Sequence, residues 1–134
     1  MTAIICLYGP ANVGKTQTLN KLIGILDPNQ RVDPENLSCD QQKVVVYNGH
    51  QIAITTAGDN RSELKQNIEF FREKGCDILV TATRTRGGSS EEANKFSQEV
   101  SCKITWLRKN GAIELKDLIN ESQAKDIQAI INKL

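Results

Sequence analysis

The chain has few aromatic side chains and almost no net charge. Aromatic residues make up 4% of its 134 residues, and the formal net charge is +1. Proteins that hold single-stranded nucleic acid stack bases on aromatic rings, and affinity for any nucleic acid depends on clustered positive charge. The composition therefore gives no specific indication of nucleic-acid binding.

Paired cysteines are also missing. Cys6, Cys39, Cys76 and Cys102 form no C-x-x-C pair, which argues against a zinc site or a dithiol redox centre. Cys6, Cys76 and Cys102 lie in or beside apolar runs. We expect these three to be buried, reduced thiols of a cytoplasmic protein. Cys39 lies in a polar segment, where we expect an exposed thiol.

Long apolar runs are missing as well. No stretch approaches the roughly 20 apolar residues that a membrane span needs. The first apolar run, residues 3–8, is too short for a signal peptide and is followed at once by a glycine-containing loop. We therefore expect no membrane association.

The apolar residues that are present follow two alternating patterns. Short apolar runs, typical of buried parallel strands, occupy residues 3–8 and 76–82, and residues 101–107 are expected to form a further strand. Apolar residues at helical spacing occupy residues 14–26, 60–75 and 90–98. This alternation predicts a single α/β domain over residues 1–134, folded as a three-layer α/β/α sandwich around a mostly parallel sheet.

An early hairpin is expected to add one antiparallel strand at an edge of this sheet. Residues 43–47 and 51–55 are strand-like, and the Asn48-Gly49 turn signal separates them. His50 lies beside this turn, so we expect a surface side chain with no catalytic role.

Two further segments are less regular. Residues 27–42 have no clear period, and a loop of this length in a small domain is usually functional or mobile, so we regard it as a possible surface for a protein partner. Near the C-terminus, Asn110-Gly111 predicts a turn into a short strand over 112–115. A final helix is expected from about Asn120, burying Ile127, Ile130, Ile131 and Leu134.

The most informative motif follows the first strand. Residues 9–16 have the pattern G-x-x-x-x-G-K-[ST], between a buried strand and an amphipathic helix. In such a loop the backbone N–H groups and the helix N-terminus bind phosphate, Lys15 reaches the β- and γ-phosphates, and the Thr16 hydroxyl ligates Mg²⁺. The expected phosphate-binding residues are Gly9, Ala11, Asn12, Val13, Gly14, Lys15, Thr16 and, near the α-phosphate, Gln17.

With this motif the chain resembles the P-loop NTPase superfamily, and its first half resembles the layout of Ras-like GTPases. In that family the strand after the hairpin ends in D-x-x-G, whose aspartate supports Mg²⁺ through water and whose glycine senses the γ-phosphate. The resemblance assigns the glycine's role to Gly58, whereas Thr55 stands at the aspartate's place. It also implies that the strand before Gly58 lies next to the phosphate-loop strand.

Asp59 stands where that family carries its water-positioning glutamine. A carboxylate there is expected to orient water or to contact the metal. An alternative is that Asp59 or Asn60 caps the helix that follows, with Glu63 placed for a capping box.

The guanine-reading N-K-x-D motif of the Ras-like family is absent. The candidate strand ends, residues 81–84 and 106–109, lack the aspartate that accepts hydrogen bonds from guanine. We therefore expect ATP rather than GTP as the nucleotide, with GTP still possible.

Two arginines follow a buried strand in the segment 83–90. Ligands of open parallel sheets bind beyond the carboxyl ends of the strands, so Arg84 and Arg86 are expected to face the nucleotide or a second substrate. Either guanidinium can stabilise charge on a transferring phosphoryl group and so affect turnover more than binding. The segment also resembles, weakly, the arginine-bearing lid of nucleotide kinases.

Three functions remain open from the sequence. The first is a Mg²⁺-dependent ATPase or nucleotide-dependent switch, which we favour. The second is a small-molecule or nucleotide kinase, for which Asp40 or Asp59 would serve as the acceptor base. The third is a regulator that binds nucleotide without hydrolysing it, because the usual magnesium-supporting aspartate is replaced by Thr55.

Overall fold

The computed structural model describes residues 2–111 and 113–134, and these contain one five-stranded sheet. The strands lie in the order β2-β3-β4-β1-β5. Every pairing is parallel except that of β2 with β3, which form the hairpin expected around Asn48-Gly49. The strand bounds are β1 Ala3–Tyr8, β2 Gln42–Tyr47, β3 His50–Thr55, β4 Ile78–Thr83 and β5 Ile104–Arg108.

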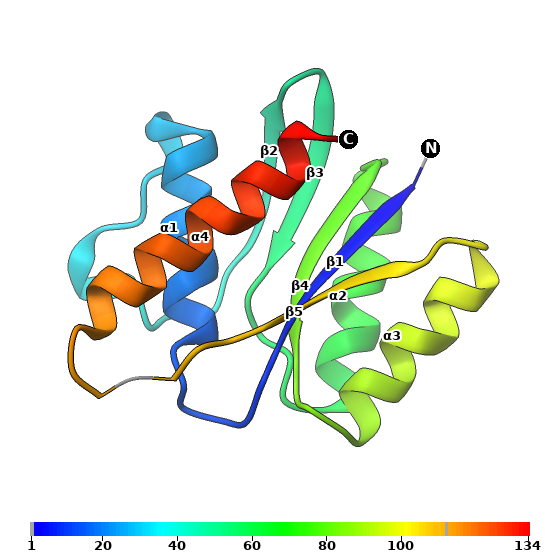
Figure 1. Cartoon of the computed structure of the whole chain (residues 1–134). Helices are drawn as coiled ribbons and strands as arrows, with labels where there is room; N and C mark the ends of the chain where they lie inside the picture. The colour runs from blue at the N-terminus through cyan, green and yellow to red at the C-terminus, as the bar shows by residue number, and fades with distance from the viewer. Residues whose placement is uncertain (1, 112) are drawn as a thin grey trace.

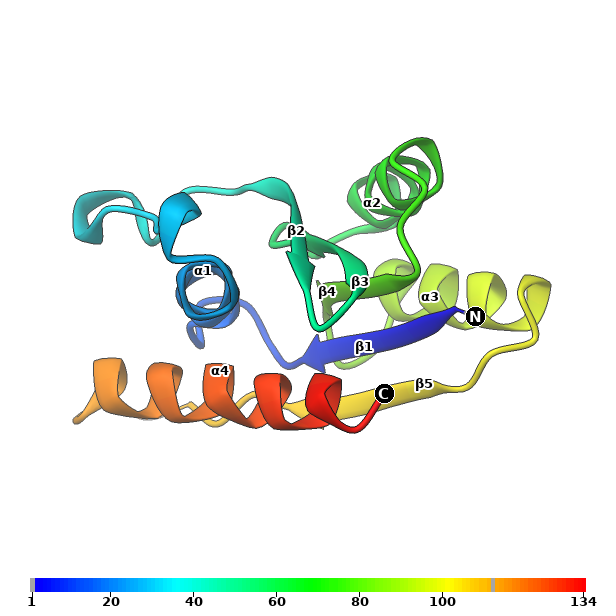
Figure 2. The same ribbon diagram turned by 90° about the horizontal axis from the view of Figure 1, so that it is seen from above.

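Helices cover both faces of this sheet, which confirms the α/β/α layering (Figure 1). The view from above places α1 and α4 on one side and α2 and α3 on the other (Figure 2). The helix bounds are α1 Lys15–Leu26, α2 Arg61–Glu73, α3 Gly88–Glu99 and α4 Lys116–Asn132, with short 3₁₀ turns η1 Pro28–Gln30 and η2 Pro34–Asn36.

The order of the strands corrects one expectation. The strand before Gly58, β3, does not lie next to the phosphate-loop strand β1, because β4 lies between them. All six residues of β4 are buried. A strand that is apolar and covered on both faces is stabilised most at the centre of a parallel sheet.

Two apolar cores lie on the two faces of the sheet. Leu19, Leu22 and Ile23 of α1 pack with Ile127 of α4 on one face. On the other face, α2 buries Leu64, Ile68 and Phe71, and α3 buries Ala93 and Phe96. The inward-facing residues of α1, α2 and α3 are those that the helical spacing predicts.

The segment before α4 differs from the expected strand. Ile113–Leu115 form a bend and a turn instead, and Ala112 lies outside the described residues. Leu115 has a left-handed backbone with a φ of 57°, which a strand does not accommodate. As a result, α4 begins at Lys116, four residues before Asn120.

The end of α4 also differs. Ile127 and Ile131 are buried as predicted, and Ile130 packs partly against the core. Leu134 is 43% exposed, so the prediction that it is buried was wrong. The helix ends at Asn132, so the inward-facing stripe does not continue to Leu134.

The cysteines and His50 have ordinary surroundings. Cys6 is fully buried, and burial raises the pKa of its thiol to about 12. Cys39 is exposed as expected, whereas Cys76 and Cys102 are only partly buried. His50 Nδ1 lies 2.6 Å from an Asp77 carboxylate oxygen, just before the start of β4. None of the helices in the described part of the chain is long and apolar enough to cross a membrane.

Candidate functional site

The loop between β1 and α1 exposes the N-terminus of a helix. Asn12 and Gly14 have left-handed φ values of 62° and 95°, a conformation that glycine adopts freely and asparagine tolerates. A Cβ at Gly14 would also lie 2.7 Å from Asn120 Oδ1, so glycine is required for space as well. Gly14 is the N-cap residue of α1 and supplies no capping side chain. The first N–H groups of α1 therefore suit an anion.

Lys15 folds back across this loop. The residue is 7% exposed, and its ammonium donates hydrogen bonds to the carbonyl oxygens of Gly9 and, at 2.9 Å, of Thr83. Burial lowers the pKa of Lys15; the nearby carboxylate of Asp59 acts in the opposite direction, and Arg84 adds to the lowering. Lys15 thus joins the carboxyl ends of β1 and β4 and lies close to Asp59 and Arg84.

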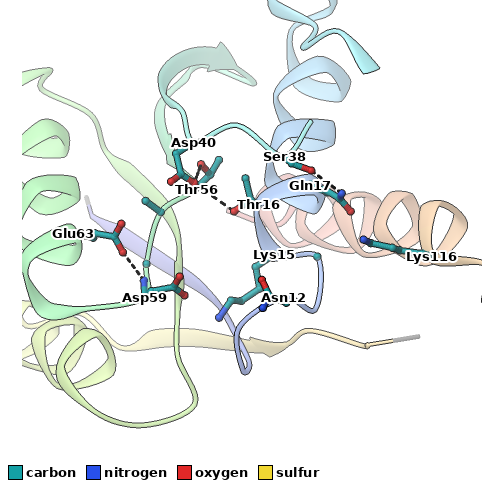
Figure 3. A pocket seen from close by; sticks show the side chains of 13 residues that line it. Asn12, Lys15, Thr16, Gln17, Ser38, Asp40, Thr56, Asp59, Glu63 and Lys116 are labelled. Carbon is teal, nitrogen blue, oxygen red and sulfur yellow. Dashed lines mark hydrogen bonds between the residues drawn. The ribbon is translucent and has the colours of Figure 1, made fainter. Parts of the chain in front are cut away.

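A cavity of about 250 Å³, here called the front cavity, opens beside Lys15 and Thr16 (Figure 3). Seven of the predicted site residues line it, namely Asn12, Gly14, Lys15, Thr16, Gln17, Gly58 and Asp59. Sequence reasoning did not assign five further lining residues to a phosphate site, namely Ser38, Thr56, Ala57, Glu63 and Lys116. Gly9, Ala11 and Val13 are not among the residues that line the front cavity.

Asp40 supplies a carboxylate directly beside Thr16. The Thr16 hydroxyl lies 3.5 Å and the Thr56 hydroxyl 3.3 Å from the same carboxylate oxygen of Asp40 (Figure 3). From the sequence, Asp40 was considered only as an acceptor base. Within the described residues no three His, Cys, Asp or Glu side chains gather as a metal site. Mg²⁺ that is bound together with phosphates needs only one or two protein oxygens, so Thr16 and Asp40 fit this ion.

Side-chain hydrogen bonds from α1 hold the loop that carries Asp40. Asn20 donates through Nδ2 to the carbonyl oxygens of Leu37 and Cys39, both at 2.8 Å. Gln17 donates to the Ser38 hydroxyl at 2.9 Å. Residues 37–39 of the long segment are therefore held against the helix that follows the 9–16 loop.

Gln17 is also held from the other side. Asn120 of α4 is fully buried and donates through Nδ2 to Gln17 Oε1 at 3.0 Å, while its Oδ1 accepts from Thr18 at 3.2 Å. Gln17 therefore links α4 to Ser38. The sequence contains no local signal for this link, because the partners on α1 and α4 are about a hundred positions apart.

Asp59 does not cap α2. Asn60 is the N-cap, and its side chain accepts from the Glu63 N–H at 2.9 Å. Glu63 accepts from the Asp59 N–H at 2.8 Å, one residue before the cap, rather than from the N-cap N–H that the expected capping box would use. The Asp59 side chain pairs instead with Arg84, whose Nε lies 2.9 Å from Asp59 Oδ1. The prediction of Asn60 as the cap is confirmed, and the alternative in which Asp59 is the cap is wrong.

The two arginines separate in the structure. Arg84 pairs with Asp59, and its charge helps to lower the pKa of Lys15. Arg86 is exposed, and within the described residues it forms no ion pair. The loop that carries both is shorter than expected, because α3 begins at Gly88 rather than at Ser90. A Cβ at Gly88 would lie 3.0 Å from Arg61 Cβ, so glycine allows the starts of α2 and α3 to approach closely.

Thr55, at the place of the family's aspartate, does not line the front cavity. It is fully buried, and its hydroxyl bonds the Thr81 hydroxyl of β4 at 2.8 Å. Asn67 of α2 donates to Thr81 as well, at 3.3 Å, and to the Ala57 carbonyl at 2.6 Å. Thr55 thus belongs to a polar layer under α2.

Comparison with known proteins gives no relative for this chain. No protein-family model matches the sequence, and neither a curated protein nor a solved structure matches it.

Proposed function

We propose that the chain binds a nucleoside triphosphate together with Mg²⁺ at residues 9–16 and acts as an ATPase or a nucleotide-dependent switch. The observation that carries the proposal is the convergence of a buried lysine and an uncapped helix N-terminus on one cavity. Both are groups that bind phosphate, and the G-x-x-x-x-G-K-T sequence supplies them in a single loop.

The metal is held on the same side of the loop. Thr16 and Asp40 would provide a hydroxyl and a carboxylate oxygen to hold it, and phosphate oxygens and water would supply the other ligands. When bound, Mg²⁺ neutralises charge on the phosphates. Ser38 and Gln17 hold the Asp40 loop against α1 in that position.

Asp59 and Arg84 are the groups for the reaction itself. Asp59 lines the front cavity and has a carboxylate that can orient an attacking water. Arg84 pairs with it beside Lys15. Both side chains are about half exposed, at 54% and 40%, so the pair is weak enough to exchange. A γ-phosphate at Lys15 attracts Arg84, which leaves the Asp59 carboxylate free to face the water.

The base is received in a second cavity that adjoins the front cavity. This side cavity has a volume of about 380 Å³ and is lined by Asn12, Val13, Gly111, Ile113 and Lys116. It shares Asn12 and Lys116 with the front cavity. Among the described residues no carboxylate lines it, so it holds a purine by apolar contact without reading guanine.

This arrangement predicts that ATP binds at least as tightly as GTP. Calorimetric titration of both nucleotides, with and without Mg²⁺, is the experiment that tests the proposed function, followed by phosphate release with and without candidate acceptors. A GTP affinity more than about tenfold tighter, roughly 1.4 kcal/mol, would contradict the base assignment. No binding of either triphosphate would overturn the proposal.

Triphosphate binding is expected to weaken at a lower alkaline pH than it would if Lys15 had the pKa of an ordinary lysine. Burial lowers the pKa of Lys15, so its ammonium, which is the form that binds phosphate, is lost as pH rises through that lowered pKa. Calorimetry across alkaline pH checks this for the wild type. Lys15→Arg is the control, because a guanidinium stays protonated throughout this range.

Asp59→Asn is expected to lower phosphate release by about tenfold or more with little change in melting temperature. The change removes the carboxylate while Asn60 keeps its capping hydrogen bond. The lost pair with Arg84 is half exposed and contributes at most about 1 kcal/mol. The matched control is Glu63→Gln, at a position that lines the same cavity, because glutamine keeps an oxygen that can accept from the Asp59 N–H.

Unaltered phosphate release in Asp59→Asn would favour the second candidate function, a nucleotide-binding regulator that does not hydrolyse. The observation behind that candidate is the burial of Thr55 in the polar layer under α2, away from the front cavity.

We also infer that the protein works in the cytoplasm, because its four cysteines are free thiols.

A further inference from the structure

A larger cavity lies along α1 and extends toward the start of α4. This rear cavity has a volume of about 490 Å³, within the range of about 300–1,000 Å³ that is usual for small-molecule sites. Its floor is one stripe of α1, formed by Gln17, Asn20, Lys21 and Gly24. These positions are spaced i, i+3, i+4 and i+7, so they lie on a single face of the helix.

The two walls of the rear cavity differ in chemistry. One wall comes from the segment after η1 and carries apolar side chains, including Val32, Pro34 and Leu37. The other comes from the first turns of α4 and carries the carboxylates of Asp117 and Glu121. The cavity therefore offers an apolar surface opposite an acidic one.

Asn20 is a buried polar residue beside this cavity. It is 1% exposed, and its Nδ2 group donates to two carbonyl oxygens, which fixes the orientation of the amide. Its Oδ1 has no hydrogen-bond partner among the described residues. The Nδ2 hydrogen bonds of the Asn20 amide fix the position of the wall that carries Leu37.

Two positively and two negatively charged side chains line the rear cavity, and the two signs come from different elements. Lys21 and Arg31 line it on the side of α1 and the loop, and Asp117 and Glu121 line it on the side of α4. Within the described part of the chain, none of these four side chains forms an ion pair. A ligand with one charge of each sign would pair with both groups, whereas a ligand with a single charge would pair with only one.

From these features we propose that the rear cavity binds a small zwitterion of the amino-acid class, with a primary ammonium, a carboxylate and an apolar body. The ammonium pairs with Asp117 and Glu121. The carboxylate pairs with Lys21 and Arg31, and the apolar body packs against Val32 and Leu37.

The rear cavity shares Gln17 and Ser38 with the front cavity. An occupant would touch the two side chains whose hydrogen bond holds the Asp40 loop. The rear cavity is itself separate from the phosphate loop, so this proposal stands whether or not the chain binds a nucleotide.

The test is a titration of the nucleotide-free protein with L-leucine, followed by amide chemical shifts in NMR. Two matched probes each lack one charge: 4-methylpentanoate has no ammonium, and 3-methylbutylamine has no carboxylate. We expect leucine to saturate shifts at Asn20, Lys21 and Val32 with a dissociation constant of about 1 mM or tighter, and each half-probe to bind at least about tenfold more weakly. Absence of saturation by leucine at about 20 mM would overturn the proposal, as would equal affinity of a half-probe.

Variants at the rim separate the site from non-specific binding. Lys21→Met and Glu121→Gln each remove one charge at the cavity and are expected to weaken leucine binding about fivefold to tenfold. Asp126→Asn, on an exposed position of α4 outside the cavity, is the control and should bind leucine as the wild type does. Unchanged affinity in both rim variants would overturn the proposed pairing.

Discussion

Replacing Lys15 by alanine is expected to weaken triphosphate binding by about 100-fold or more, roughly 2.7 kcal/mol, while the fold remains intact. The Lys15 ammonium is buried beside the phosphate loop. In the complex it would donate charge-assisted hydrogen bonds to phosphate oxygens, and these are stronger than hydrogen bonds between neutral groups. Calorimetric titration with ATP and Mg²⁺ measures the loss, and thermal unfolding measures the stability.

The fold should tolerate this change because the groups that Lys15 contacts keep most of their partners. The Thr83 carbonyl also accepts from the Gly9 N–H, at 3.2 Å. Burial lowers the pKa of Lys15, which means that its charged form is held at a cost in the folded state.

Lys109→Ala is the matched control for Lys15→Ala. Lys109 is also buried, at 4% exposed, and its ammonium also donates to a backbone carbonyl, that of Asn110. Its pKa is lowered too, by burial first and by the neighbouring Lys116 second. The two lysines therefore resemble each other in burial and charge, but Lys109 does not line the front cavity.

We expect Lys109→Ala to keep triphosphate affinity within about threefold of the wild type, roughly 0.6 kcal/mol. Equal losses in the two variants would mean that general positive charge, rather than the phosphate loop, attracts the ligand. Both variants are titrated under the same salt and Mg²⁺ conditions, because screening by salt changes any general attraction.

Gly58→Ala is expected to destabilise the protein by roughly 3 kcal/mol, at the upper end for overpacking a core. A Cβ at this position would lie 1.7 Å from the carbonyl oxygen of Ala82 and 2.4 Å from its carbon. Both atoms are backbone of β4, the central strand, so neither can rotate away as a flexible side chain would. Either the free energy of unfolding falls or the segment that carries Asp59 is displaced.

Gly49→Ala separates this contact from the ordinary cost of losing a glycine. A Cβ at Gly49 would meet nothing within 4 Å, but its φ of +77° strains an alanine, at a cost of about 1–2 kcal/mol. Gly58 has no such φ, so its cost comes from the contact alone. Urea unfolding of both variants, with phosphate release for Gly58→Ala, measures the two effects. A smaller loss of stability in Gly58→Ala than in Gly49→Ala, with normal phosphate release, would contradict the close packing seen here.

The fold was predictable where the signal is local. The helical spacing of Leu19, Leu22 and Ile23 identified the buried face of α1, and Asn48-Gly49 identified the hairpin. The order of the strands was not predictable in this way, because the insertion of β4 between β1 and β3 depends on pairing between distant segments. The left-handed Leu115 was not signalled either, since leucine rarely adopts that backbone.

The candidate site likewise has parts that depend on local sequence and parts that depend on contacts between distant segments. The G-x-x-x-x-G-K-T motif consists of consecutive residues, and Lys15 and Thr16 within it both line the front cavity. The position of Asp40 depends on hydrogen bonds from Asn20 and Gln17, which lie on another element. Neither amide is recognisable in advance as a support for a loop, because its partners become neighbours only after folding.

The exposed thiol of Cys39 is a labelling site on the loop that carries Asp40. Cys39 lies between Ser38 and Asp40 in the sequence. Cys6 is fully buried, and burial raises the pKa of its thiol, which disfavours alkylation there, while Cys76 and Cys102 are partly buried. The backbone carbonyl of Cys39 accepts a hydrogen bond from Asn20, so a movement of the loop away from α1 would change the surroundings of Cys39. A fluorophore attached at Cys39 would therefore report, by its emission, whether the loop lies against α1 or has moved away from it.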